Sequence, residues 1–203
     1  MTARDADLRS AIRASWSSIC WSVVAGVAAI TVGLAANTLS LLAYGLDGLV
    51  DSIASGVILL DLKVEVHGGH PPAHRRAERT VGLALVLIGA VVSVQSVRGL
   101  RSGDGPDPSS FGIAIAFASM VVLPPLAVWK IRVGRRLNST ALQGDGILTA
   151  AGSALAAITL TGMLLDRKLG WWWADPAAAM VIGAFLIVAG ILILWDRGAH
   201  ART

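Results

Sequence analysis

Two aspartates, Asp47 and Asp51, lie four residues apart in an apolar stretch, 40–60, that is long enough to cross a lipid bilayer. This spacing places both carboxylates on one face of a helix, with Cβ atoms about 5–6 Å apart. One ionised carboxylate at the centre of a bilayer costs about 2.5–3.5 kcal/mol on insertion scales, and two also repel each other. Hard oxygen ligands suit Mg, Ca and Mn and also bind Zn. The pair therefore predicts the binding of a cation, of exchangeable protons, or of both.

A third acid, Asp145, lies about one turn into another apolar stretch, 140–165. It has two interpretations. Ser139 or Thr140 could cap that helix, and an acid in the first turns of a helix is favoured by the helix dipole. Alternatively, Asp145 faces the aspartate pair as a third ligand or a proton acceptor, with Thr149 one turn further along the same face.

Neutralisation of the pair by basic side chains from other helices is a competing explanation. It requires a Lys or Arg inside a membrane span. The sequence places no Lys or Arg in the middle of any apolar stretch. We therefore expect a bound ion, not a protein cation, as the partner of Asp47 and Asp51.

Three of the four histidines, His67, His70 and His74, fall within one short loop. Imidazole is a common ligand of Zn and related ions, and closely spaced histidines on a loop can converge on one ion. Short histidine-rich loops can also be merely solvated. The spacing leaves both interpretations open.

These residues must be positioned by membrane-spanning helices. The chain has 203 residues, of which 55% are hydrophobic and only 15% charged, below the roughly 25% charged residues of ordinary soluble domains. This composition leaves no room for a soluble domain with a basic face, which argues against a nucleic-acid partner. We predict an all-α integral membrane bundle of six transmembrane helices. The apolar segments lie at about 17–36, 40–62, 80–97, 111–129, 140–165 and 176–195.

Basic residues set the expected orientation, because loops on the cytoplasmic side carry an excess of Lys and Arg. With the N-terminus inside, thirteen basic residues fall on the inner side and four on the outer side. We therefore expect cytoplasmic N- and C-termini in a multi-pass protein of the cell (inner) membrane. The expected organisation is a cytoplasmic tail at 1–14, a transmembrane domain at 15–196 and a short tail at 197–203 without a cytoplasmic C-terminal domain.

Four patches, 40–52, 70–78, 138–145 and 173–176, carry a resemblance to a known family. The first has two acids four apart, and the second reads His-Pro-Pro-Ala-His-Arg-Arg-Ala-Glu. The third ends in Asp145, and the fourth reads Trp-Ala-Asp-Pro. Together they resemble the transmembrane domain of cation diffusion facilitators, antiporters that exchange Zn, Mn, Fe or related divalent ions for protons. The likeness covers about residues 15–195.

The resemblance implies roles for individual residues. Asp47 and Asp51 match the two transport-site acids of the family's second helix. His70 and His74 match loop histidines that hold a second, cytoplasmic-side ion in some members. His67 falls where some members have an acid in that second site.

The fifth helix departs from the family pattern. Asp145 matches an acid near the start of that helix, but members usually complete the transport site with a His or Asp and an Asp, four apart. Alignment on Asp145 puts Leu148 and Gly152 at those positions, and neither side chain can bind a metal. The leading candidate for the missing ligand is then Asp145.

These observations predict a divalent metal cation transporter whose substrate is the ion itself, with proton-coupled efflux, no organic cofactor and a homodimeric state. The alternative is a non-transporting metal-binding membrane protein, either a sensor or an accessory subunit. A transporter of small organic cations is a third reading. An enzyme is not expected, because the sequence shows no nucleophile–base pair and no phosphate-binding loop.

Overall fold

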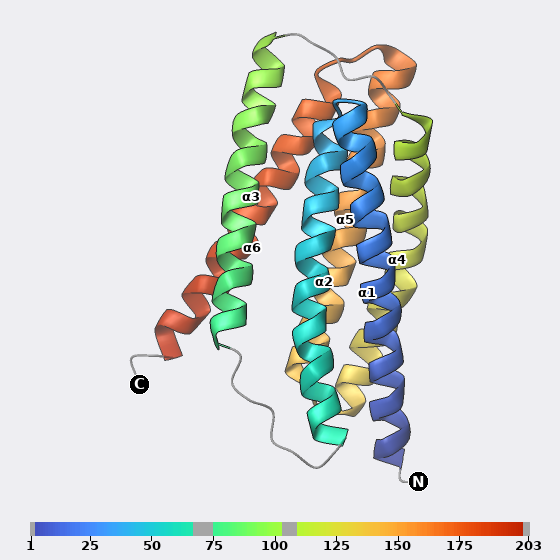
Figure 1. The fold of residues 1–203 in the computed structure, drawn as a ribbon, viewed down its shortest axis with the longest axis vertical. Helices are drawn as coiled ribbons and strands as arrows, with labels where there is room; N and C mark the ends of the chain where they lie inside the picture. The colour runs from blue at the N-terminus through green and yellow to red at the C-terminus, as the bar shows by residue number, and fades with distance from the viewer. Residues whose placement is uncertain (1–2, 67–74, 103–108, 201–203) are drawn as a thin grey trace.

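A computed structural model of the chain describes residues 3–66, 75–102 and 109–200, and every regular element in them is an α-helix. Each helix contains a stretch long and apolar enough to cross a membrane. The predicted six-helix all-α fold is confirmed, and the chain is a multi-pass membrane protein. In chain order the helices are α1 (Ala3–Ala35), α2 (Leu39–Val66), α3 (Arg75–Ser102), α4 (Ser110–Arg136), α5 (Thr140–Leu169) and α6 (Ala174–His200) (Figure 1).

The helices are longer than the apolar segments that predict them. α1 already begins at Ala3, inside the segment 1–14 that was expected to be a tail, and α4 continues to Arg136. An apolar run marks only the part of a helix that meets lipid, whereas the backbone hydrogen bonds of the helix can continue into polar sequence. This extension matters for the site, because it places residues from the expected helix ends inside the bundle.

Two tight turns join α1 to α2 and α4 to α5. Asn37 and Asn138 adopt left-handed φ angles of 54° and 51° in these turns, a conformation that Asn tolerates better than most residues with a Cβ. In both turns the next N–H donates at 2.9 Å to a glycine carbonyl five residues back: Thr38 to Gly33, and Ser139 to Gly134. The two helix pairs are therefore closely connected antiparallel hairpins.

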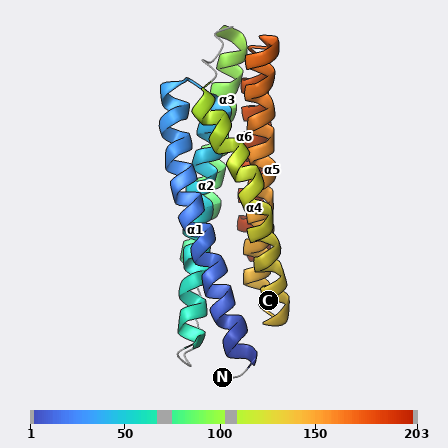
Figure 2. The same cartoon turned by 90° about the vertical axis from the view of Figure 1, so that its right-hand side faces the viewer.

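The four helices of these hairpins form one part of the molecule. Figure 2 shows α1 and α4 on the near side, with α2 and α5 behind them. α2 also contacts α3 and α6. It therefore lies between the other hairpin helices and the α3–α6 pair.

α3 and α6 pack against each other at unusually short range. A Cβ on Gly89 of α3 would lie 2.6 Å from the carbonyl oxygen of Gly183, and a Cβ on Gly190 of α6 would lie 2.6 Å from that of Gly82. Glycine at these crossings lets the two backbones approach, as small residues do between membrane helices. Toward its C-terminal end α6 leans away from the hairpin helices, as Figure 1 shows.

The start of α2 is capped by a side chain from α6. Asp175 is 1% exposed and accepts hydrogen bonds from the backbone N–H groups of Leu39 at 2.8 Å and Ser40 at 3.3 Å. The hydroxyl group of Ser40 also donates to the same carboxylate. A carboxylate in this position satisfies N–H groups that have no partner within the helix, and it suits the positive end of the helix dipole. The first turns of α2 and α6 are thereby joined.

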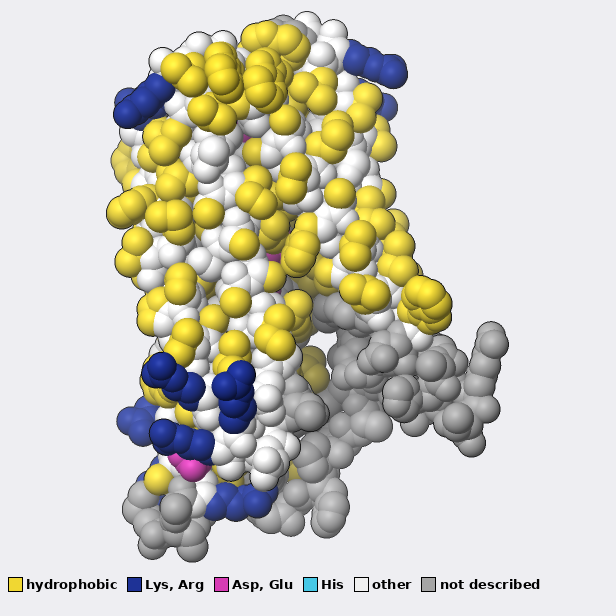
Figure 3. Space-filling view, turned by 180° about the vertical axis from the view of Figure 1, so that it is seen from behind, with side chains coloured by type: hydrophobic (Ala, Val, Ile, Leu, Met, Phe, Trp, Pro, Cys, Tyr) yellow, Lys and Arg dark blue, Asp and Glu magenta, His cyan; other side chains and the backbone are white. Residues whose placement is uncertain are grey.

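The outer surface of the bundle is apolar along its length. Figure 3 shows hydrophobic side chains covering the middle of one face, while Lys and Arg lie toward its two ends. Tryptophans 171, 172 and 173, between α5 and α6, are exposed, and the rings of Trp171 and Trp173 stack with centroids 5.3 Å apart. Charged ends with tryptophan near the boundary are typical of a bundle that crosses a bilayer.

Candidate metal-ion site

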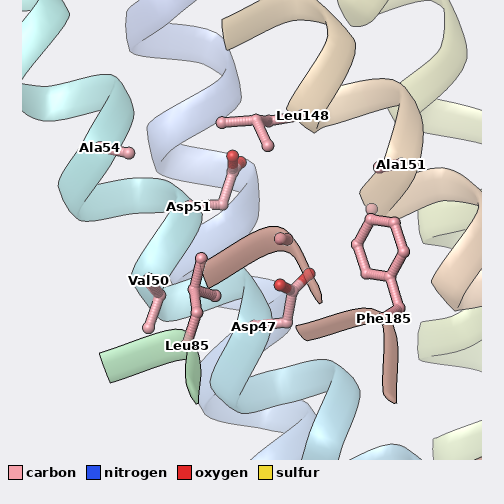
Figure 4. Close-up of a pocket in the computed structure, with 10 residues that line it drawn as sticks. Asp47, Val50, Asp51, Ala54, Leu85, Leu148, Ala151 and Phe185 are labelled. Carbon is pink, nitrogen blue, oxygen red and sulfur yellow. The ribbon is translucent and has the colours of Figure 1, made fainter. Parts of the chain in front are cut away.

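Asp47 and Asp51 project from successive turns of α2 into a small cavity inside the bundle (Figure 4). The cavity lies between α2, α3, α5 and α6. Apart from the two aspartates, the side chains around it are apolar or small. The remaining lining residues are Val50, Ala54, Leu85, Leu148, Ala151, Gly152, Phe185 and Ala189.

The two carboxylates lie close enough to act on each other electrostatically. The Oδ1 atom of Asp51 is buried and has no hydrogen-bond partner among the described residues. A buried carboxylate oxygen without a partner is costly, because the desolvation penalty is not offset by a new interaction. A cation in the cavity would supply the missing partner for this oxygen.

The size of the cavity limits what it can hold. Its volume is about 30 Å³, and a cavity needs roughly 10–15 Å³ to hold one water molecule. That is room for a bare metal ion with a water or two.

The fifth helix contributes no ligand to the cavity. Leu148 and Gly152 line it, so the two α5 positions that the resemblance associates with metal binding do face the aspartates. In Figure 4, Leu148 lies next to the carboxylate of Asp51. Within the described part of the chain, no group of three His, Cys, Asp or Glu side chains is arranged to hold one metal ion. The cavity therefore offers a pair of carboxylates.

Asp145 does not line this cavity; it forms a buried ion pair with Lys130 of α4. The distance from Lys130 Nζ to Asp145 Oδ2 is 2.8 Å, and both side chains are completely buried. The hydroxyl group of Ser55 donates to Asp145 Oδ1 at 2.5 Å. Lys130 Nζ also donates to the hydroxyl oxygens of Ser55 at 3.2 Å and Thr149 at 3.1 Å. This Lys130 network, formed by Lys130, Asp145, Ser55 and Thr149, joins α2, α4 and α5.

Lys130 corrects the expectation that no basic residue lies inside the bundle. That expectation ended the fourth apolar segment at residue 129 and counted Lys130 among the basic residues of the inner side. In the structure α4 continues to Arg136, and Lys130 is completely buried. The protein therefore does contain an internal cation next to its buried acids.

A sequence signal for this burial exists. The buried positions of α4 recur every three or four residues, and Lys130 follows Leu123 and Ala127 on the same helix face. A lysine in phase with such a stripe points toward the core, whereas its neighbours Arg132 and Arg135 are exposed. The position of Lys130 on the helix face therefore predicts its burial better than its distance from the end of the apolar run does.

The capping interpretation of the fifth helix is confirmed in one detail. Ser139 is the N-cap of α5, and its hydroxyl oxygen accepts the backbone N–H of Leu142 at 3.3 Å.

The histidine cluster of His67, His70 and His74 lies outside the described residues, so its predicted metal site stays a prediction.

Comparison with known proteins finds a family model and several relatives that match most of the chain. The family model for the cation efflux transmembrane domain matches residues 15–199. Transmembrane protein 163 of Xenopus laevis is 24% identical over 197 residues, which are 96% of this chain and 69% of that protein. An uncharacterized transporter of Methanocaldococcus jannaschii is 24% identical over 176 residues, 83% of this chain and 62% of the relative.

A third similar protein has a more explicit name. The cation-efflux pump FieF of Shewanella oneidensis is 25% identical over 177 residues, which cover 81% of this chain and 59% of the pump. The chain thus spans between about three-fifths and two-thirds of the length of these relatives.

Proposed function

The chain belongs to the cation efflux family, and from that premise we propose that it transports a divalent metal ion of the Zn, Mn or Fe class across the cell membrane. The family is one of transporters, not of enzymes. In this proposal Asp47 and Asp51 bind the ion, which is the substrate, and no organic cofactor takes part.

The observation that carries the proposal is the cavity at α2. It brings two carboxylates together in an apolar setting and has room for an ion. It also leaves one buried carboxylate oxygen without a hydrogen-bond partner in the part of the chain that the structure describes. Buried acids inside a membrane bundle mark ion pathways by default, because their desolvation must be offset by a bound charge or a proton.

Charge balance supports exchange of the ion for protons. A divalent cation neutralises two ionised carboxylates, and two protons neutralise the same pair after the ion leaves. Because the two acids interact, their protons and the ion compete for one shared site. The aspartate pair is therefore neutral both with the ion bound and with two protons bound. The protein can change conformation in either of these two states without a net charge at the site, which favours proton-coupled efflux.

The remaining parts of the proposal rest on sequence. The distribution of basic residues supports cytoplasmic termini and efflux from the cytoplasm. The family resemblance supports a homodimer. It also supports a second ion site on the cytoplasmic side at His67, His70 and His74.

Transport into proteoliposomes tests the proposal. Zn²⁺ and Mn²⁺ uptake should depend on an imposed pH gradient and fall to background in the Asp47→Asn/Asp51→Asn double variant. Asp7→Asn is a matched control, since Asp7 lies in α1 and pairs with Arg136 at 3.5 Å, away from the cavity. Unchanged uptake in the double variant would overturn the proposal.

A second function is favoured by the α5 side of the cavity. Leu148 and Gly152 leave the ion without the ligands that would complete a tetrahedral site. A sensor or accessory subunit would bind the ion without moving it. Zn²⁺ binding without coupled proton movement in vesicles would favour this second function.

A further inference from the structure

The Lys130 network lies next to the cavity of Asp47 and Asp51 without being part of it. Ser55, which donates to Asp145, follows Asp51 by one turn on α2. Leu148, which lines the cavity, follows Asp145 by one turn on α5. Asp51 lies within electrostatic range of both Lys130 and Asp145. Any change in the charge of the network therefore acts on the cavity.

We infer that Lys130 is a positioning residue that keeps Asp145 out of the ion site and so limits that site to two carboxylates. This inference rests on the proposed function. Three acids, Asp47, Asp51 and Asp145, lie in this part of the bundle. Lys130 neutralises one of them by direct contact at 2.8 Å, which leaves two negative charges for the ion.

The hydrogen bonds of the network hold Asp145 in this role. Its Oδ2 atom contacts Lys130 and its Oδ1 atom accepts from Ser55, so both oxygens have a partner from another helix. Lys130 in turn donates to Ser55 and Thr149, which fixes the position of its ammonium group. To bind an ion in the cavity, Asp145 would have to give up both of its partners.

The number of carboxylates sets how tightly a divalent ion is held, because affinity rises with the charge of the ligands. A site with three ionised carboxylates would hold the ion more tightly and release it more slowly. Two carboxylates balance the charge of the ion without excess. Lys130 thus adjusts the site toward release, although it touches no atom of the proposed ligands Asp47 and Asp51 in any hydrogen bond or ion pair of the described structure.

Three variants of the full chain test the inference by titration with Zn²⁺ and with Mn²⁺. Each variant is expected to change the affinity for the ion in a different way. Lys130→Met frees the charge of Asp145, so affinity should rise by more than about tenfold and uptake into proteoliposomes should slow. Asp145→Asn frees the charge of Lys130 beside Asp51, so affinity should fall. The double variant Lys130→Met/Asp145→Asn removes both charges and should bind within a few-fold of the wild type.

A purely structural role for the ion pair predicts another pattern, because all the single variants would then weaken binding. If Asp145 is itself a ligand, the double variant should bind as weakly as Asp145→Asn. Either result overturns the inference. Should Lys130→Met fail to fold, as judged by size-exclusion chromatography and circular dichroism, the decisive comparison is between Asp145→Asn and the double variant, where adding Lys130→Met must restore affinity.

The wild-type titration separates this inference from the proposed function. A wild-type chain that binds neither ion overturns the proposed function and the inference with it. A wild-type chain that binds an ion while the variants lack the opposite signs overturns the inference alone.

Discussion

The bundle contains two groups of buried carboxylates that differ in the partner of their negative charge. Asp145 has a protein cation at 2.8 Å and a hydroxyl donor on its other oxygen. Asp51 has an oxygen with no partner among the described residues, and its neighbour Asp47 adds repulsion. Both groups lie at the interface of α2 and α5, about one helical turn apart.

The difference shows how burial can serve two purposes. A paired buried acid is held in place, and removing its partner is far more damaging than the modest net stability of the pair suggests. An unpaired buried acid costs stability in the empty protein and recovers that cost when its ligand binds. The first kind of acid ties helices together, and the second kind is ready for an ion.

The largest expected effect breaks the paired group. Asp145→Asn leaves the ammonium group of Lys130 buried without its carboxylate, which should cost about 3–5 kcal/mol in the free energy of unfolding. Unfolding of the purified protein in SDS measures this change. The double variant Lys130→Met/Asp145→Asn should regain most of the loss, and a double variant as unstable as the single one would contradict the pairing.

The next effect sharpens the description of the cavity. Leu148→His/Gly152→Asp places two metal ligands at the α5 positions that face Asp47 and Asp51. A Cβ on Gly152 has room, because its nearest neighbour is the Leu123 side chain at 3.7 Å. Completing a four-ligand site should raise Zn²⁺ affinity by more than about tenfold, or about 1.4 kcal/mol.

Calorimetric titration of this variant with Zn²⁺ provides the measurement. Leu148→Ala/Gly152→Ala is the matched control, since it changes the same positions without adding a ligand. Equal Zn²⁺ affinity in the two variants would mean that α5 does not face the ion.

The smallest effect tests the unpaired group. The charge that acts on Asp47 is that of Asp51, and it is repulsive. Asp47→Asn should therefore stabilise the metal-free protein by about 1 kcal/mol, as substitutions at strained functional sites often do. Thermal unfolding in detergent without metal measures it, and a loss of stability similar to that of Asp145→Asn would remove the distinction between the two groups.

The fold and the aspartate pair were predictable because both depend on local patterns. Long apolar runs predict spans, and a spacing of four puts Asp47 and Asp51 on one face whatever surrounds them. The exposure of Leu148 and Gly152 to the cavity also agrees with the alignment on Asp145.

The partner of Asp145 was not predicted, because it depends on a contact between helices. Hydropathy treats Lys130 as the end of a span, although α4 continues for six further residues to Arg136. Only the packing of α4 on α5 shows that Lys130 reaches Asp145 and that Asp145 is directed to a cation instead of the cavity. Such a contact is invisible to any single-helix pattern.

The carboxylate of Asp175 has a mechanical consequence for the bundle. Separating the start of α6 from the start of α2 breaks the hydrogen bonds that Leu39 and Ser40 make with Asp175. Swinging the far end of α6 breaks none of them. The glycine contacts pack α3 closely against α6, so a rotation of this helix pair about Asp175 would carry with it the wall of the cavity that holds Leu85 and Phe185.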